Sequence, residues 1–181
     1  SAVGGTGAHP LAGMGSGFNK IKSNEPILVD LVHAHRGYMV DKTRMFSVGK
    51  LPQQWHERLE HMLEVSDMVV SSLAEGEDCA MAWEKGSQLA DEFGYGDNLM
   101  GMKPDQSRFL GHSVGLQLDE SPVVAKGFNR PLPVGGTMAI EPKVVFLEGS
   151  TGIEDTWIRV PEGIKCLTRI GDTEENFVLE V

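Results

Sequence analysis

Residues 27–49 read ILVDLVHAHRGYMVDKTRMFSVG, and this stretch decides the fold. The apolar, β-branched run over residues 26–33 is typical of a buried strand. A short polar turn follows at residues 34–37, and a second strand-like run over residues 38–48 ends at Gly49. The stretch therefore predicts a β-hairpin.

Each strand of this predicted hairpin contains an aspartate. A hairpin centred on residues 35 and 36 places Asp30 directly opposite Asp41. Two carboxylates facing each other destabilise a strand pair, whereas a cation between them makes them a ligand set. The apolar neighbours of Asp30 favour a buried site, because an unpaired charge is costly in such surroundings. The alternative is a solvated face on which the two acids merely lie near each other.

Two helices are expected after the hairpin. The first covers residues 52–74 and ends at Gly76, and the second covers residues 79–93, with Asp78 as its cap and Gly94 as its end. Apolar residues recur every three or four positions, which is typical of an amphipathic helix. The expected buried stripe of the first helix is Trp55, Leu59, Met62, Ser66, Val69 and Leu73, and that of the second is Ala82, Trp83, Gly86, Leu89, Ala90 and Phe93.

Beyond residue 108 the helical period disappears, and short apolar runs are broken by Gly and Pro. Strands are expected within residues 109–118, 122–125, 137–147, 153–160 and 164–169. A strand pair, a helix pair and several further strands predict an α+β fold with helices on one face of an antiparallel sheet. Residues 1–25 are rich in glycine and are expected to form an irregular lead-in.

Composition excludes several functions. The chain has 181 residues, 26 acidic and 16 basic, and a formal charge of −10. Nucleic acid and anionic membranes call for a basic face, so neither is an expected partner. No apolar run approaches the length of a membrane span. The two cysteines, Cys79 and Cys166, fit a reducing, cytoplasmic setting in which both are small core residues, although a disulfide between them is an open alternative.

Further ionisable residues interrupt apolar strands. They are His112 within residues 109–116, Glu141 after Met138-Ala-Ile140, and Glu154 within residues 152–158. Each alone is weak, and a lone histidine in such a run is more often a core residue. Together with the hairpin aspartates they make four carboxylates and one imidazole. This donor set suits Mn, Co or Zn, and carboxylates that bridge allow two divalent ions.

The ordered set resembles that of the pita-bread metallopeptidases, which include methionine aminopeptidase, proline aminopeptidase and Xaa-Pro dipeptidase. The blocks that carry the resemblance are ILVDLVHAHRGYMVDKTRMFSVG, GHSVGLQLDESP, MAIEPKVVF and GIEDTWIRV, within residues 27–160. The resemblance implies a curved antiparallel sheet with helices on one face. It also implies that residues 1–181 form a single C-terminal catalytic domain that is truncated at its N-terminus, with the first helices of the fold missing.

The resemblance also implies a role for each matching residue. Asp30 would bind one of two divalent ions, and Asp41 and Glu154 would bridge both. His112 and Glu141 would complete the second metal, and Glu141 would handle the proton of the catalytic water, which makes Glu141 and His112 the expected catalytic residues. The gap of 13 residues between Glu141 and Glu154 favours the proline-directed branch, whose substrate is a peptide with proline in the second position.

Three further residues are weaker candidates for substrate binding. Asp119 stands where the family usually carries a second histidine, in a segment similar to HExP. His9 precedes the first aspartate, but its Gly-rich surroundings favour a plain loop. Arg169 lies where some relatives place a site arginine, and a surface arginine is the equal alternative.

Two expectations concern the whole molecule. Without the family's first helices, the sheet face near residues 27–33 and 39–46 is expected to expose apolar surface, through which a homodimer is a possible outcome. The rival to an enzyme is a non-catalytic pita-bread module that binds peptides or proteins.

Overall fold

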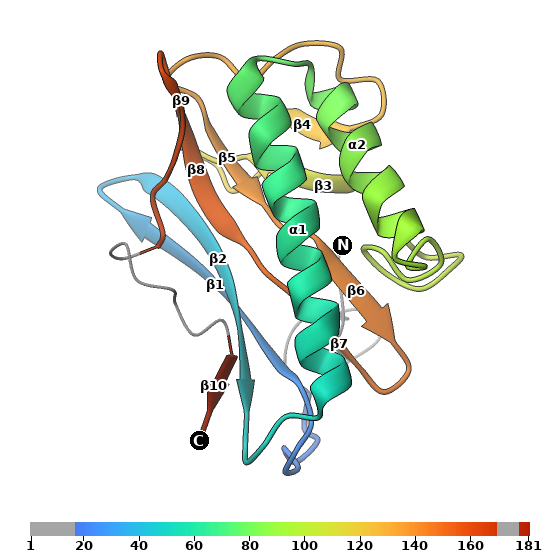
Figure 1. The fold of residues 1–181 in the computed structure, drawn as a ribbon. Coiled ribbons are helices and arrows are strands. Elements are labelled where there is room, and N and C mark those ends of the chain that lie inside the picture. The colour runs from blue at the N-terminus through green and yellow to red at the C-terminus, as the bar shows by residue number, and fades with distance from the viewer. Residues whose placement is uncertain (1–16, 170–177) are drawn as a thin grey trace.

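The structure is a computed structural model, and it describes residues 17–169 and 178–181. Two helices lie on the same side of curved strands, with α1 running along them and α2 beside it (Figure 1). In chain order the elements are β1 Ile27–His35, β2 Tyr38–Ser47, α1 Gln53–Glu75, α2 Cys79–Glu92, β3 Phe109–Ser113, β4 Glu120–Ala125, β5 Thr137–Ile140, β6 Lys143–Phe146, β7 Gly149–Gly152, β8 Asp155–Val160, β9 Gly163–Cys166 and β10 Val178–Glu180.

The strands form three hydrogen-bonded groups. Their orders are β1-β2-β10, β4-β3-β5-β8-β9 and β6-β7. All pairings are antiparallel except that of β10 with β2. Because β2 also contacts β5, β7 and β8, the groups meet around its middle. The expected α+β architecture with helices on one face is confirmed.

The hairpin forms, but its predicted register is wrong. Its turn falls at Arg36-Gly37, one residue later than expected, and Gly37 takes a positive φ of 89° that suits a tight hairpin turn. Asp30 therefore pairs with Thr43, and Asp41 pairs with Val32. Since Thr43 and Asp41 are two residues apart on β2, both aspartates still point to the same face, as diagonal neighbours.

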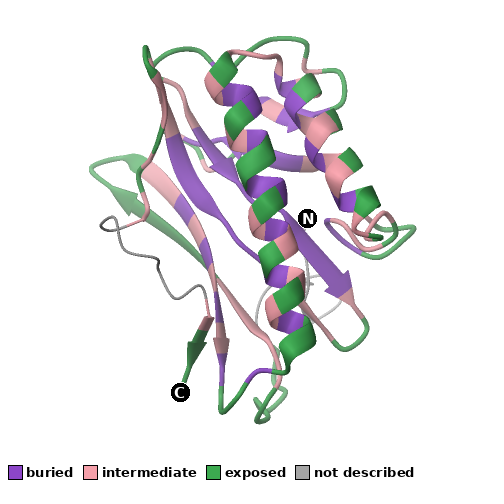
Figure 2. Ribbon diagram, viewed as in Figure 1, coloured by how far each residue is buried: buried purple, intermediate pink, exposed green. Residues whose placement is uncertain are grey.

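The prediction that the first strand is buried is also wrong. Residues 30–35 of β1 are exposed and residues 27–29 are only partly buried (Figure 2). The reason is that β1 is an edge strand whose described pairing is with β2 alone. Leu31 and Val32 are 56% and 46% exposed, so the apolar surface expected on this hairpin is present.

Both helices occur where expected, within one or two residues. All six predicted stripe residues of α1 are buried, and Gly76 ends the helix with a φ of 86° in the left-handed region. The main core lies between the helices and the strands. A β-carbon on Gly86 would lie 2.8 Å from side-chain carbons of Leu110 and Val69, so this glycine lets α2 approach α1 closely. Asp78 stands at the N-cap of α2 but makes no side-chain capping hydrogen bond.

The run over residues 137–147 is two strands rather than one. β5 ends at Ile140 and β6 begins at Lys143, with Glu141 and Pro142 between them. Proline has no N–H to give to a ladder, which fits a break at this point. Likewise β3 covers only the first five residues of the run 109–118. The break after β5 leaves Glu141 at a corner of the sheet, beside the residues described next.

Candidate metal centre

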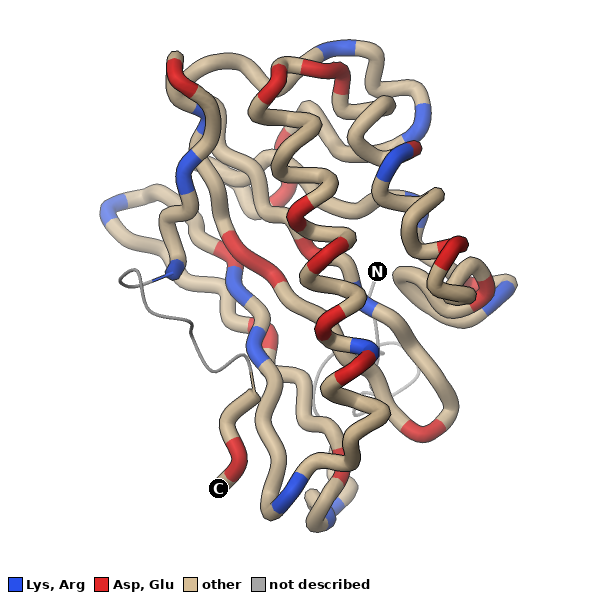
Figure 3. The backbone as a smooth tube through the Cα atoms, in the orientation of Figure 1, with Lys and Arg blue, Asp and Glu red and all other residues tan. Residues whose placement is uncertain are grey.

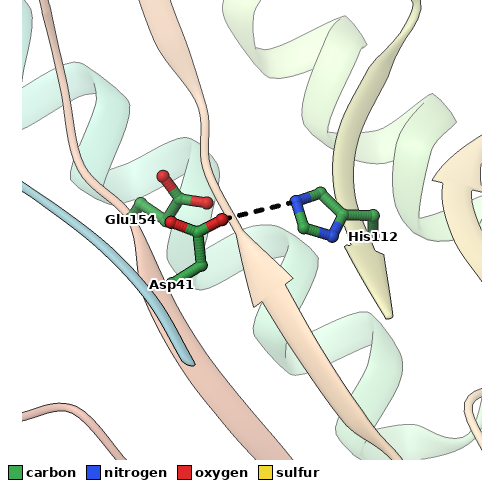
Figure 4. Close-up of side chains that lie close together, drawn as sticks. All are labelled: Asp41, His112 and Glu154. Atoms are coloured by element: carbon green, nitrogen blue, oxygen red, sulfur yellow. Dashed lines mark ion pairs between the residues drawn. The ribbon is translucent and has the colours of Figure 1, made fainter. Parts of the chain in front are cut away.

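Asp41, His112 and Glu154 meet in the interior of the fold. Asp41 comes from β2, His112 from β3, and Glu154 from the segment between β7 and β8 (Figure 4). One ligand atom of each lies within 4.8 Å of one of each of the others, and all three residues are buried. The His112 Nε2 atom is 3.9 Å from Asp41 Oδ2. Three parts of the chain that are far apart in sequence therefore supply one group of donors.

Backbone pairing holds the two carboxylates in place. Thr43 of β2 bridges to Glu154, its N–H donating to the Glu154 carbonyl at 3.2 Å and its hydroxyl donating to Glu154 Oε2 at 2.8 Å. The hydroxyl of Thr156 accepts from the Asp41 N–H at 3.1 Å and donates to the Asp41 carbonyl at 2.8 Å. The middle of β2 is thus fixed to the start of β8 on both sides of the site.

His112 reaches the site because β3 and β5 approach closely. A β-carbon on Gly111 would lie 2.4 Å from the Ala139 carbonyl oxygen, so a side chain there would push these strands apart. The approach brings His112 Nε2 to 3.3 Å from Glu141 Oε1. Glu141 is buried, and its N–H donates to the Leu110 carbonyl at 2.9 Å. His112 and Glu141 are therefore brought together at one corner of the site.

The site residues have shifted pKa values because charges are crowded in a buried place. Burial, followed by the charges of Glu154 and Asp30, raises the pKa of Asp41 to about 8. Burial and the charge of Glu141 raise the pKa of Glu154 to about 7. Burial lowers the pKa of His112, but hydrogen bonding to Glu141 and the charges of Glu141 and Asp119 outweigh it, raising that pKa to about 9. This cluster of acids therefore favours a positive charge among them.

Unsatisfied oxygens test whether a metal ion fits these residues. Asp41 Oδ1 and Glu154 Oε1 are buried and have no hydrogen-bond partner within the described part of the chain. Buried polar atoms almost always have a partner, and such exceptions call for an explanation. Two carboxylate oxygens and an imidazole nitrogen are ligands that divalent transition metals accept. Asp41, His112 and Glu154 therefore fit one divalent ion.

A lysine in the same cluster escaped the sequence analysis. Lys143 of β6 is 2% exposed, and its ammonium lies 2.8 Å from Glu141 Oε2 and 2.8 Å from Glu154 Oε2. The signal was available, because Lys143 is a second charged residue, close to Glu141, in the largely apolar run of residues 137–147. Burial lowers the pKa of Lys143, but the charges of Glu141, Glu154 and Asp30 outweigh this effect and raise it.

Asp30 lies at the open side of the cluster. Its side chain is 49% exposed, and Asp30 Oδ2 is 3.6 Å from the Lys143 ammonium. Its charge is also near enough to Asp41 to raise the pKa of that carboxyl. The structure thus brings all five predicted ligands into one neighbourhood, with Asp41, His112 and Glu154 in reach of a shared point and Asp30 beside both Asp41 and Lys143.

The weaker candidates lie in different places. Asp119 is 73% exposed, its Oδ1 atom is 3.6 Å from His112 Nδ1, and it lines an open hollow of about 600 Å³ with Leu116, Phe128 and four other residues. Arg169 instead donates to Asp155 Oδ2 at 2.8 Å. His9 lies outside the described residues.

Asp155, next to Glu154, is the centre of a separate ion-pair network. It is 1% exposed and also accepts hydrogen bonds from Arg44 at 2.7 Å and from the Thr168 hydroxyl at 2.6 Å. Figure 3 shows acidic and basic residues next to one another where β2 passes β8. This network ties β2, β8 and the segment after β9 together behind the site. Arg169 is thus a partner of Asp155 in the structure.

Cys79 and Cys166 are both free, which excludes the disulfide between them. Among the described residues, no helix is both long and apolar enough to cross a membrane.

Comparison with known proteins agrees with this picture. The chain is 28% identical over 151 residues to an Xaa-Pro dipeptidase of Pyrococcus furiosus, a match that covers 83% of this chain and 41% of that protein. It is 26% identical over 156 residues to an Xaa-Pro dipeptidase of Lactobacillus delbrueckii subsp. lactis, covering 85% of this chain and 40% of that protein. The chain therefore spans about two-fifths of the length of these relatives.

A solved structure shows the same fold. The prolidase from Pyrococcus horikoshii superposes with a TM-score of 0.79 at 29% identity, over 97% of this chain and 48% of that chain. The fold is accordingly the pita-bread fold, and the chain spans about half the length of that prolidase. The model of metallopeptidase family M24 matches residues 1–160. Because this match covers most of the chain, the chain belongs to metallopeptidase family M24.

Proposed function

We propose that this chain is the catalytic domain of a metal-dependent exopeptidase that hydrolyses the bond between an N-terminal residue and a following proline. The activity would be that of an Xaa-Pro dipeptidase or aminopeptidase. The observation that carries the proposal is the buried group Asp41, His112 and Glu154, with two carboxylate oxygens that lack a partner in the described structure. The names of the relatives support the substrate class.

The metal ligands of the proposal follow the sequence pattern. Asp41, His112 and Glu154 would hold a divalent ion (Mn, Co or Zn), and Asp30 and Glu141 complete the five-residue set for which the family resemblance implies two ions. When bound, a divalent ion supplies Lewis acidity, which makes water a better nucleophile near neutral pH and polarises a carbonyl. In this chain the ammonium of Lys143 lies between the carboxylates that a second ion would need.

The proton-transfer role falls to Glu141. Its Oε2 atom is bound by Lys143, while Oε1 faces His112, so one oxygen is directed toward the group of donors. A carboxylate so placed can accept a proton from water and pass it to the leaving nitrogen. Asp119 and the hollow it lines adjoin His112, so we infer that the peptide substrate binds on this side of the site.

The free cysteines fit a cytoplasmic location.

The test is hydrolysis by the purified chain. The chain is stripped with a chelator, reloaded separately with Mn, Co or Zn, and given alanyl-proline, alanyl-alanine and a longer Xaa-Pro peptide. We expect metal-dependent release of the first residue from the Xaa-Pro substrates only. His112→Ala should abolish this release, whereas His33→Ala, on an exposed position of β1, should not. Release that persists in the stripped chain or in His112→Ala contradicts the proposal.

Lys143 and Asp119 favour one rival, a non-catalytic module that binds peptides. An ammonium inside the carboxylate cluster and a carboxylate in the usual place of a histidine both change the groups that would act on a substrate. The rival predicts that the metal-loaded chain binds an Xaa-Pro peptide in calorimetry and releases no product. The proposed enzyme predicts turnover of the same peptide.

A further inference from the structure

The position of Lys143 within the acidic cluster is the feature on which this inference rests. Its ammonium is 2.8 Å from Glu141 Oε2, 2.8 Å from Glu154 Oε2 and 3.6 Å from Asp30 Oδ2. Three carboxylates from three different segments therefore surround one cation. The lysine is 2% exposed, so water cannot take the place of these partners.

The fold makes specific room for this side chain. Lys143 pairs with Gly152 across the β6–β7 hairpin. A β-carbon on Gly152 would lie 2.5 Å from Lys143 Cγ and 2.7 Å from Lys143 Cα. A glycine opposite the lysine thus leaves space for its aliphatic stem, which carries the charge inward to the acids. The position of the ammonium is set by the strand pairing and is not a chance rotamer on the surface.

The surrounding charges show what the ammonium does. Asp30, Asp41, Glu141 and Glu154 are four acids in one small region, and buried like charges repel strongly unless a cation lies between them. The Lys143 ammonium binds one oxygen each of Glu141 and Glu154, while Asp41 Oδ1 and Glu154 Oε1 are left without partners among the described residues. The lysine thus supplies a hydrogen-bond partner to some of the carboxylate oxygens of the cluster and leaves others without one.

We propose that the ammonium of Lys143 takes the place of one of the two divalent ions, so that the chain binds a single ion at Asp41, His112 and Glu154. This deepens the proposed function and rests on it for the presence of a metal. A second ion shared by Asp30 and Glu154 would have to lie beside the ammonium. The two cations would then repel each other strongly. The ammonium already binds Glu154, the carboxylate that this second ion would share with Asp30.

The experiment counts ions. The chelator-treated chain is dialysed against excess Mn²⁺, and bound manganese per chain is measured by mass spectrometry, with calorimetry as a second count. We expect one ion per wild-type chain and two in Lys143→Ala, where the space and the carboxylates are released. Lys165→Ala, which removes an exposed ammonium from β9, is the matched control and should bind one.

A thermal readout gives a second test. Without metal, Lys143→Ala should melt at a lower temperature than the wild type, because its acids lose their counter-charge. Added Mn²⁺ should raise its melting temperature more than that of the wild type, since two ions bind instead of one. Lys143→Ser opens the same space and replaces Lys143→Ala if the alanine variant does not fold.

Several results overturn the inference. The inference is overturned if the wild-type chain binds two ions or none, and this count depends on no variant. A single ion in folded Lys143→Ala overturns it as well. The peptidase assay separates this failure from that of the proposed function. One bound ion without hydrolysis of alanyl-proline refutes the peptidase alone, and hydrolysis with two bound ions refutes the role of Lys143 alone.

Discussion

Replacing Asp155 by asparagine tests whether the ion-pair network behind the site holds the fold together. The carboxylate is 1% exposed and accepts hydrogen bonds from Arg44, Thr168 and Arg169 at 2.6–2.8 Å. Asparagine keeps the size but removes the charge. A hydrogen bond involving a charged group contributes about 1.5–3 kcal/mol and a neutral one about 0.5–1.5 kcal/mol. The substitution weakens two arginine contacts and turns an amide N–H toward one of the donors. The free energy of unfolding should therefore fall by about 3 kcal/mol, the low end of the range for breaking a buried ion pair.

This loss is readily measurable. For a domain of 150–250 residues, each kcal/mol of lost unfolding free energy lowers the melting temperature by roughly 2–4 °C. Asp155→Asn should therefore melt about 6–12 °C below the wild type. Differential scanning calorimetry and urea unfolding give the two numbers. The matched control is Asp105→Asn, which makes the same chemical change at an exposed position and should shift the melting temperature by less than about 2 °C. A loss below about 1 kcal/mol in Asp155→Asn would refute the reasoning.

The same network decides between two roles for Arg169. If its main partner is Asp155, Arg169→Ala lowers the melting temperature and leaves KM for an Xaa-Pro dipeptide nearly unchanged. If instead it contacts the substrate, KM rises and the melting temperature hardly moves. Measuring both quantities on one preparation separates the two roles.

Three further predictions concern the site. Millimolar Mn²⁺ or Co²⁺ should raise the melting temperature of the stripped chain, because an ion that binds the folded state stabilises it, and an unchanged value would argue against the site. Asp41 and Glu154, whose pKa values are raised to about 8 and about 7, hold protons in the folded chain that they lose when it unfolds. The free energy of unfolding of the stripped chain should therefore fall as the pH rises from about 4 to about 8. Urea titrations in a chelator at pH 5 and pH 8 check this, and greater stability at pH 8 would contradict it. Gly111→Ala should destabilise the chain and weaken metal binding together, because its β-carbon would meet the Ala139 carbonyl at 2.4 Å; unchanged manganese affinity would show that the approach of β3 to β5 does not position His112.

The helices were predictable because periodicity is a local property. The spacing of Trp55 and Leu73 along one stripe needs no knowledge of the partner surface, and Gly76 marks the helix end through its own backbone preference. The register of the first hairpin was not predictable in this way. It depends on whether the turn is centred on residues 35 and 36 or on Arg36 and Gly37, and this shift of one residue moves the partner of Asp30 by two positions.

That Asp41, His112 and Glu154 lie together was predictable from the sequence, whereas their contacts with Lys143 were not. Asp41, His112 and Glu154 could be chosen because acids and histidines in apolar strands are costly unless they have a purpose. The role of Lys143 depends on the pairing of β6 with β7, because this hairpin folds the lysine back beside Glu154, eleven residues further along the chain. The pairing of Arg169 with Asp155 is likewise a tertiary contact that no spacing in the sequence reveals.

The exposed edge position of β1 has a consequence for how the centre moves. Asp30 belongs to a strand held on one side by β2, while Asp41 and Glu154 belong to the buried interior. Segments with few buried contacts open locally at a free energy well below that of global unfolding. Amide hydrogen exchange should therefore be fast along β1 and slow along β5 and β8. Each local opening of β1 would carry Asp30 away from Lys143, while Asp41 and Glu154 keep their positions in the interior.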